Sequence, residues 1–303
     1  PLRALAFRQL DLSEYDLILT SSSAEAKAVN VRPDAIKITY CHGPSRYYWT
    51  DYDSYLGSPG LGRLDPIARI GLKARLGPMR ALDRKAAHSG DLLVANSAYI
   101  QRQIAQHYGR SSEIVSPPVD TDRFASYGHD PAVRTGFVIA GRQTHYKRFD
   151  LAVDACTRLR VPLTVIGNGP EHNRLRRIAG PTVTFLTDVD DTEMPKFFGS
   201  ARAFLLPGIE DFGITPVEAM AAGTPVIAYR AGGALEYVRP GVTGLFFNTQ
   251  TVNGLIGVLR EFQDLQLDHM RIRQLADRYR LEAFRANMRE LIQQQIDLKP
   301  GIV

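Results

Sequence analysis

The sequence has 303 residues, of which 44% are hydrophobic and 23% are charged, and its formal net charge is +5 with a pI near 9.2. This composition excludes a disordered, fibrous or disulfide-stapled protein, and the length allows two domains with a cleft between them. The positive charge favours anionic partners, but it does not choose between nucleic acid, a membrane surface and phosphorylated small molecules.

The sequence shows no membrane span and no secretion signal. No apolar run approaches the roughly 20 residues that cross a bilayer, and the first ten residues lack an apolar core. We therefore expect a cytoplasmic protein. The two cysteines, Cys41 and Cys156, lie in apolar stretches, which favours reduced, buried thiols, and nothing in the sequence resembles a Cys/His metal cluster.

Short apolar runs alternate with amphipathic stretches, which is typical of βαβ units and predicts an α/β fold. After a short helical opening segment, the first half predicts strands at 15–20, 36–41, 92–96 and 113–116 and helices near 24–29, 64–88 and 98–108. The second half predicts strands at 136–140, 163–167, 183–186, 203–206 and 225–228, helices beginning near Lys147, Pro170, Asp191 and Pro216, and a helical tail over 255–296. The first sheet is small or incomplete, whereas the second half forms a complete doubly wound unit.

A linker is predicted where Pro117 and Pro118 are followed by turn-forming residues as far as Pro131. We place the domain boundary near residue 130, so that 1–130 forms the N-terminal domain and 131–280 the C-terminal domain. The final segment, 281–303, is expected to be a helix that packs back on the first domain.

The sharpest motif occupies residues 207–227, which read as a strand end, an acidic loop, a helix, a turn and a strand. The backbone N–H groups of Gly213 to Thr215 stand at a helix start beyond the carboxyl end of a strand, where phosphates bind. A structural interpretation competes with this one: Thr215, Pro216 and Glu218 fit a capping box, with Thr215 as the N-cap. That interpretation leaves Glu210 without a role.

Two further loops follow predicted strands. In the first, Gly141 precedes the cations Arg142 and Lys147, which could converge on a diphosphate or form an ordinary solvated loop. In the second, Gly167, Asn168 and Gly169 fit a nucleotide-approaching turn, although the same pattern serves a plain tight turn.

Together these residues, in this order over about 36–250, resemble the family 4 glycosyltransferases of the GT-B fold, close to their mannosyltransferase-type members. The resemblance implies two Rossmann-like domains that face a cleft. It also implies that Glu210 holds hydroxyls of the donor sugar, that Glu218 holds the nucleotide ribose, and that Arg142 and Lys147 bind the donor diphosphate. It places Gly167 to Gly169 and the loop of Leu186 and Thr187 near the base pocket, and Phe212, Gly213, Ile214 and Thr215 at the phosphate-binding backbone.

The first half resembles the same subgroup at residues 39–49, where His42 follows a predicted strand. The resemblance implies that His42 faces the donor sugar across the cleft, whereas a lone strand-end histidine is more often structural. Members of the family normally carry several tens of residues ahead of this point, including the first strand and a glycine-rich turn. We therefore expect a fragment with an incomplete N-terminal domain, which binds the donor better than it transfers sugar.

The expected activity is retaining, metal-independent hexosyl transfer from a nucleotide sugar, in which Arg142, Lys147 and the helix start at Thr215 stabilise the leaving diphosphate. The resemblance favours GDP-mannose as the donor, leaves UDP-sugars open, and requires no cofactor. A non-catalytic nucleotide-sugar-binding subunit is the main alternative. A nicotinamide-dependent oxidoreductase ranks low because no Gly-x-Gly-x-x-Gly follows a strand, and dispersed cations argue against nucleic acid.

The acceptor is expected to be a glycan or a lipid-linked sugar, as in polysaccharide biosynthesis. Cations alternate with apolar residues between Arg63 and Lys85, so this stretch fits either a helix on the inner face of an anionic membrane or a domain-surface helix with solvated charges.

Overall fold

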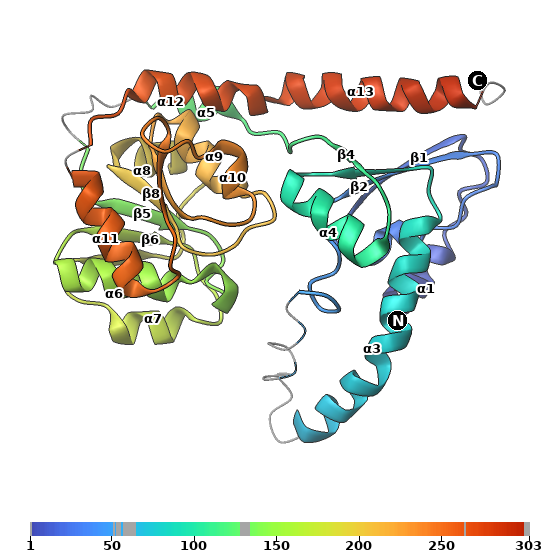
Figure 1. Ribbon diagram of the computed structural model, residues 1–303, viewed down its shortest axis with the longest axis horizontal. Coiled ribbons are helices and arrows are strands. Elements are labelled where there is room, and N and C mark those ends of the chain that lie inside the picture. The colour runs from blue at the N-terminus through green and yellow to red at the C-terminus, as the bar shows by residue number, and fades with distance from the viewer. Residues whose placement is uncertain are drawn as a thin grey trace. The chain divides into compact units, whose positions relative to one another are not determined.

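The computed structural model describes residues 2–50, 52, 56, 65–127, 134–263 and 265–299. Contacts within the chain divide it into a first unit, Pro1–Ser116 with Arg285–Val303, and a second unit, Pro117–Phe284. Each unit contains its own parallel sheet with helices between the strands, which confirms the α/β fold (Figure 1). The boundary predicted near residue 130 lies outside the described residues, and the roles of the domains stay predictions.

The sheet of the first unit has the strand order β1 (Leu17–Ser22), β2 (Ile36–Cys41), β3 (Leu92–Ala95) and β4 (Glu113–Ile114). These strands match the four predicted ones with small shifts at their ends. The helices of this unit are α1 (Leu2–Arg8), the 3₁₀ helix η1 (Glu25–Ala28), α3 (Asp65–His88) and α4 (Ala98–Tyr108). Ser97 caps α4 by accepting from the Ile100 N–H, and Gly109 ends it in the left-handed conformation.

Helices α3 and α4 pack on one face of the first sheet through Ala87, Ile100 and Ile104, which contact Leu93 and Ala95. Within this layer the Asp83 carboxylate has three donors. Its Oδ1 lies 2.7 Å from Lys27 Nζ. Its Oδ2 accepts from Trp49 Nε1 at 2.8 Å and from Tyr108 Oη at 2.7 Å. A buried carboxylate with three donors is satisfied, so this group serves the packing of the unit.

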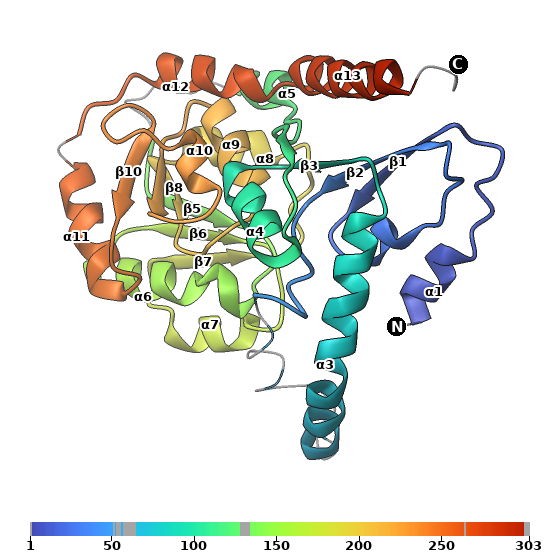
Figure 2. The same ribbon diagram turned by 45° about the vertical axis from the view of Figure 1, so that its right-hand side comes forward.

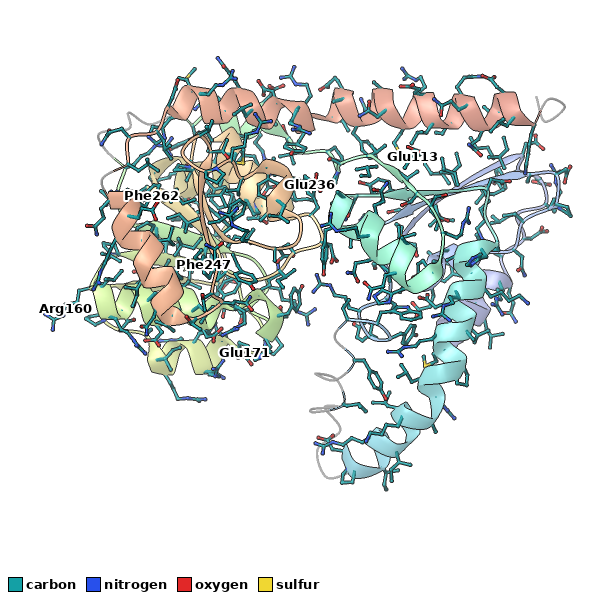
Figure 3. All side chains as sticks on the ribbon, in the orientation of Figure 1. Glu113, Arg160, Glu171, Glu236, Phe247 and Phe262 are labelled. Atoms are coloured by element: carbon teal, nitrogen blue, oxygen red, sulfur yellow. The ribbon has the colours of Figure 1, made fainter. Side chains whose placement is uncertain are left out.

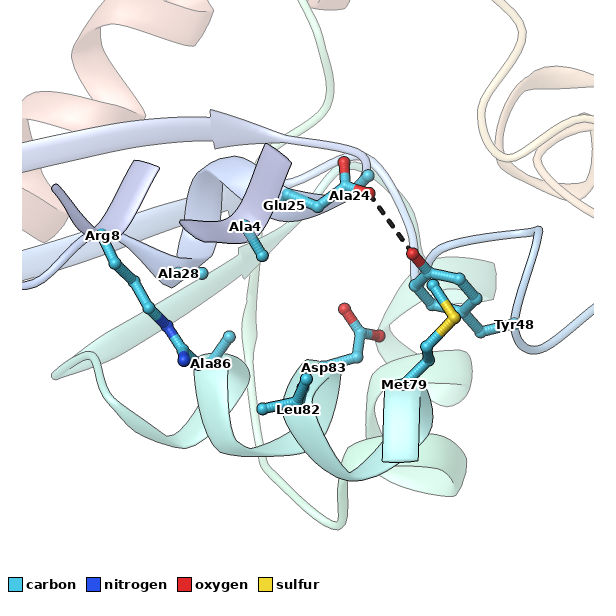
Figure 4. Close-up of a pocket in the computed structure, with 10 residues that line it drawn as sticks. All are labelled: Ala4, Arg8, Ala24, Glu25, Ala28, Tyr48, Met79, Leu82, Asp83 and Ala86. Atoms are coloured by element: carbon cyan, nitrogen blue, oxygen red, sulfur yellow. Dashed lines mark hydrogen bonds between the residues drawn. The ribbon is translucent and has the colours of Figure 1, made fainter. Parts of the chain in front are cut away.

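A cavity lies beside Asp83, between α1, η1 and α3 (Figure 4). Its volume is about 30 Å³, and alanines form much of its lining. Glu25 accepts a hydrogen bond from Tyr48 Oη, 3.3 Å away, at its rim. A space of this size holds one or two water molecules, so as it stands it is too small for a sugar.

The second unit contains a six-stranded parallel sheet, and its strand order is β10-β9-β8-β5-β6-β7. Its strands are β5 (Phe137–Ala140), β6 (Leu163–Ile166), β7 (Val183–Leu186), β8 (Ala203–Leu206), β9 (Val226–Tyr229) and β10 (Gly244–Phe247). Five of them are confirmed predictions, whereas β10 was missed. The order reverses between β5 and β8, and open sheets of this kind bind ligands beyond the carboxyl ends of the strands at such a switch point.

The remaining elements of the chain are α5 (Thr121–Ala125), η4 (His145–Lys147), α6 (Phe149–Leu159), α7 (His172–Ile178), α8 (Met194–Ser200), α9 (Ile214–Ala221), α10 (Ala234–Tyr237), α11 (Val252–Gln263), α12 (His269–Ala276), η5 (Asp277–Tyr279) and α13 (Leu281–Leu298). The short helices α5 and α10 were not predicted. In the described ranges no helix is long and apolar enough to cross a membrane.

Helices cover both faces of the second sheet (Figures 1 and 2). Alternate strand residues serve the two faces: Phe137 and Ile139 pack with α6, α7 and α11, whereas Val138 and Ala140 pack with α5, α8, α9 and α12. Phe247 and Phe262 fill the first of these layers, and Arg160 points into solvent where α6 ends (Figure 3).

The two chain segments at the borders of the second unit lie side by side. The Val119 N–H donates to the Tyr279 carbonyl at 2.8 Å, and Val119 forms a parallel bridge with Arg280. Beyond Phe284, α13 continues into the first unit. Lys299 follows that helix, and its Nζ lies 2.8 Å from Asp91 Oδ1 and donates to the Ala35 carbonyl at 3.0 Å.

Candidate functional site

The predicted donor-site residues of the second unit follow four neighbouring strands, β8, β5, β6 and β7. Because these strands are parallel, their carboxyl ends meet at one edge of the sheet, next to the switch point. The loops and helix starts at this edge carry Gly141, Arg142, Lys147, Gly167, Asn168, Gly169, Thr187, Glu210, Phe212, Gly213, Ile214 and Thr215. The structure therefore brings these predicted residues to the same edge.

Lys147 and Glu210 form an ion pair at this edge. Lys147 Nζ lies 2.8 Å from Glu210 Oε1, and the side chains are 21% and 15% exposed. The two loops approach so closely that a Cβ on Gly208 would lie 2.6 Å from Lys147 Cα, which only glycine tolerates. Arg142 is exposed and has no ionic partner in the part of the chain that the structure describes.

The loop that carries Glu210 is held by two glycines that the sequence reasoning missed. The Gly233 N–H donates to the Glu210 carbonyl at 2.8 Å. Gly232 has a φ of 64°, and a Cβ there would lie 2.5 Å from the same carbonyl oxygen. A strand followed by two glycines and a helix was the available signal, because β9 ends at Tyr229 and α10 begins at Ala234.

Helix α9 begins at Ile214, and the competing interpretation, a capping box with Thr215 as the N-cap, is wrong. Gly213 is the N-cap, with a φ of 93°, and Thr215 is the second helical residue, so its hydroxyl does not cap the helix. The reason lies in the loop: Tyr237 Oη donates to the Phe212 carbonyl, and a Cβ on Gly213 would lie 2.6 Å from that hydroxyl. Left-handed Gly213 therefore starts the helix two residues earlier than expected.

The start of α9 offers backbone donors. The N–H groups of Gly213, Ile214 and Thr215 have no acceptor among the described residues, and Pro216 has no N–H. Unpaired N–H groups at a helix start carry partial positive charge and bind anions. Together with Lys147 and Arg142, they make this edge of the sheet suited to a phosphate group.

Glu218 lies one turn further along α9 and is 20% exposed. Its Oε1 lies 3.9 Å from Arg123 Nη2, which comes from α5. Burial raises the pKa of Glu218 to about 7, with a lowering contribution from Arg123 and raising contributions from Asp191 and Asp120. The carboxyl group therefore changes charge near neutral pH.

Gln143 joins the loops after β5 and β6. It is fully buried, its N–H donates to the Asn168 carbonyl at 2.8 Å, and its Nε2 donates to the Gly167 carbonyl at 2.6 Å. A Cβ on Gly167 would lie 2.4 Å from the Gly141 carbonyl, and one on Gly169 would lie 2.5 Å from the Gln143 carbonyl. Glycine at these two positions therefore allows the loops after β5 and β6 to pack against each other.

The loop after β7 borders an open groove of about 370 Å³. Along the outer edge of the sheet the groove is lined by His172, Arg176, Val183, Phe185 and Thr187. The Leu186 carbonyl accepts from the Gly167 N–H at 2.8 Å, so the Gly167 turn is joined to the end of β7. Thr187 is exposed at its end.

Comparison with known proteins places this geometry in a family. Residues 133–278 match the family model described as "Glycosyl transferases group 1". Over this segment, just under half of its length, the chain is similar to the group 1 glycosyl transferases. The chain is 30% identical over 214 residues to the GDP-mannose-dependent alpha-(1-6)-phosphatidylinositol monomannoside mannosyltransferase of Mycobacterium tuberculosis, a match that covers 60% of this chain and 55% of the relative.

A second relative is the D-inositol 3-phosphate glycosyltransferase of Geodermatophilus obscurus, which is 31% identical over 195 residues that cover 54% of this chain and 43% of the relative. The chain thus spans about half the length of the curated relatives it matches.

Solved structures show the GT-B fold. Sucrose-phosphate synthase from Thermosynechococcus elongatus matches with a TM-score of 0.70 and 19% identity, over 94% of this chain and 75% of that chain. HepE of Anabaena in complex with UDP matches with a TM-score of 0.66 and 18% identity, over 93% and 79%. At these identities the likeness concerns the fold alone.

His42 lies in the first unit, after β2. Its ring Nε2 is 2.7 Å from Ser21 Oγ. Its backbone N–H donates to the Ser22 carbonyl at 2.9 Å, and its backbone carbonyl accepts from Asn96 Nδ2 at 3.2 Å. These contacts fix the residue between the carboxyl ends of β1 and β3. The role predicted for its imidazole stays a prediction.

Proposed function

We propose that the protein is a retaining, metal-independent hexosyltransferase that transfers mannose from GDP-mannose to a glycan or lipid-linked acceptor. The observation that carries the proposal is the meeting of Lys147, Arg142 and the start of α9 at the switch-point edge, with the Glu210 carboxylate beside them. The mannosyltransferase relatives, named as GDP-mannose-dependent, support this donor over UDP-sugars.

In this proposal the protein's main contribution is electrostatic. As the bond from the sugar to the diphosphate breaks, negative charge grows on the leaving phosphate oxygens. Lys147, Arg142 and the N–H groups at Ile214 and Thr215 stabilise that charge, at about 3 kcal/mol for a well-placed donor. Glu210 holds hydroxyls of the sugar, Glu218 holds the ribose, and neither needs to act as a nucleophile.

The second candidate is a non-catalytic subunit that binds a sugar nucleotide. The same edge of the sheet supports this candidate, because its residues suffice to bind the nucleotide without transferring the sugar. Calorimetry with GDP, UDP, GDP-mannose and UDP-glucose tests binding, and release of nucleotide with an added lipid-linked acceptor tests transfer. We expect GDP-mannose to bind best. Binding without transfer to any acceptor would favour the second candidate, and no nucleotide binding at all would contradict both.

We further propose that α3 attaches the enzyme to the inner face of an anionic membrane. Ile67 and Ile70 are 70% and 71% exposed near its start, and the cations Arg69, Lys73 and Arg75 accompany them. Apolar side chains between cations fit a lipid surface with negative head groups. The lipid named as acceptor of the M. tuberculosis relative supports this position.

Vesicle flotation tests the membrane proposal. The unmodified chain should bind vesicles with phosphatidylglycerol better than neutral ones, and an Ile67→Ser/Ile70→Ser variant should lose most of this binding. Leu235→Ser and Met270→Ser, which replace exposed apolar side chains of the second unit, serve as controls. Equal binding by the α3 variant and the unmodified chain would contradict the proposal.

A further inference from the structure

Arg123 stands on the short helix α5, and three contacts fix its position. Asp120 caps α5, since its Oδ1 accepts from the Arg123 N–H at 3.2 Å. The next residue, Phe124, is fully buried and stacks on Phe198 with 5.7 Å between ring centroids. The guanidinium carbon of Arg123 lies 4.6 Å from the centroid of the Phe124 ring, which favours a cation.

This arrangement directs the guanidinium group toward Glu218. The distance from Arg123 Nη2 to Glu218 Oε1 is 3.9 Å, and Arg123 Nε is buried without a hydrogen-bond partner among the described residues. Arg123 Nε also lies 3.9 Å from Asp120 Oδ2, so the guanidinium group stands between two carboxylates at equal distances. Its charge acts on the Glu218 carboxylate through a partly desolvated space, where screening by water is reduced.

We propose that Arg123 is a positioning residue, which keeps the Glu218 carboxylate ionised and directed toward the ribose of the donor. The inference rests on the proposed function, in which Glu218 holds the ribose. An ionised carboxylate accepts hydrogen bonds from two ribose hydroxyls, whereas a protonated one carries a donor of its own and accepts less well.

The charges around Glu218 come from several elements. Asp120 and Arg123 lie on the α5 side, and Asp191 precedes α8; both aspartates oppose ionisation of Glu218. Helix α12 also packs on α9, but its His269 contacts the Gly223 carbonyl beyond the other end of α9. Among the charged groups that shift the pKa of Glu218, Arg123 is the cation, and it favours the ionised carboxylate.

The test is the pH profile of donor binding by the full chain, measured by calorimetry with GDP-mannose. Both of its phosphates are esterified, so no phosphate proton titrates near neutrality. Since the pKa of Glu218 is raised to about 7, we expect binding to weaken by about tenfold from pH 8 to pH 6. A histidine beside the phosphates would change binding in the opposite direction, because a histidine gains positive charge at low pH.

Arg123→Met should move the fall in affinity to higher pH, so that binding at pH 7 is weakened by roughly three- to tenfold and recovers at higher pH. Arg123→Lys keeps the charge and should restore most of the profile, and Glu218→Gln should bind weakly with little dependence on pH. Thermal melting checks that each variant is folded.

The outcomes separate the inference from the proposed function. Equal weakening by Arg123→Met at every pH would overturn the positioning role, because a purely structural side chain gives that result. An unchanged pH profile in Glu218→Gln would overturn it as well. No binding of GDP-mannose or UDP-glucose by the unmodified chain at any pH would overturn the proposed function, and the inference would fail with it.

Discussion

Lys147 Nζ lies 2.8 Å from Glu210 Oε1, so the cation proposed for the donor diphosphate and the carboxylate proposed for the donor sugar neutralise each other in the structure. A diphosphate that binds Lys147 has to compete with Glu210. The same exchange frees the Glu210 carboxylate for a sugar hydroxyl. In the proposed function, binding of the diphosphate and binding of the sugar are therefore expected to be coupled.

The first prediction follows from this pair. Glu210→Gln should tighten binding of GDP by roughly three- to fivefold, because Lys147 no longer has a charged competitor, in line with the ~1 kcal/mol of an ion pair near the surface. Calorimetry of GDP binding measures the gain. In a Lys147→Met background the gain should vanish, and a gain that persists there would show that Glu210 acts through another group.

The second prediction concerns the two cations. Lys147→Met and Arg142→Ala should each weaken GDP binding by roughly 10- to 100-fold, as expected for loss of a charge-assisted contact, while guanosine binding stays nearly unchanged. Arg158→Ala removes a charge from an exposed ion pair on α6 and serves as the control. Equal losses for GDP and guanosine would move Lys147 and Arg142 out of the phosphate site.

The third prediction uses the raised pKa of Glu218. Its pKa is about 7 in the folded chain and near the ordinary value of 4.5 when unfolded. The charged form is therefore less favourable in the folded state, and stability falls as the pH rises from 4.5 through 7. Glu218→Gln should raise the free energy of unfolding by roughly 1–3 kcal/mol at pH 8 and hardly at pH 4.5. Denaturation at both pH values measures this, and an equal effect at both would contradict it.

The fourth prediction compares two glycines with positive φ. At Gly213 a Cβ would meet the Tyr237 hydroxyl at 2.6 Å, whereas at Gly241 it would meet nothing within 4 Å. Gly241→Ala should cost only about 1 kcal/mol of backbone strain and leave GDP binding intact. Gly213→Ala should cost more and also weaken GDP binding, because the start of α9 shifts. Chemical denaturation and calorimetry distinguish the two, and equal effects would contradict the role of Gly213.

Much of the fold could be predicted because apolar runs mark parallel strands buried on both faces. β2 (Ile36–Cys41) and β8 (Ala203–Leu206) were predicted to the residue. β10 (Gly244–Phe247) was missed because it is short and begins with a glycine, whose φ is 153°. Glycine weakens the local signal of a strand, and only pairing with β9 establishes it.

The residues of the candidate site could be predicted where a strand, a glycine and a charged residue follow one another, as at Gly141 and Lys147. The contacts between them could not. Nothing in the sequence spacing indicates that Glu210 pairs with Lys147, or that Gly232 and Gly233 hold the Glu210 loop. The alternative with Thr215 as the N-cap fitted the local pattern, because such patterns take no account of a left-handed glycine whose loop is held by a distant tyrosine hydroxyl.

The first unit is assembled from both ends of the chain, since it combines Pro1–Ser116 with Arg285–Val303. During synthesis, residues 1–116 leave the ribosome long before the helix that completes their unit, while the second unit is continuous and can fold as soon as it emerges. Domains usually fold in the order in which they are made. Here the order is expected to reverse, because the contacts of Lys299 with Asp91 and Ala35 form only once α13 and the residue after it have been made.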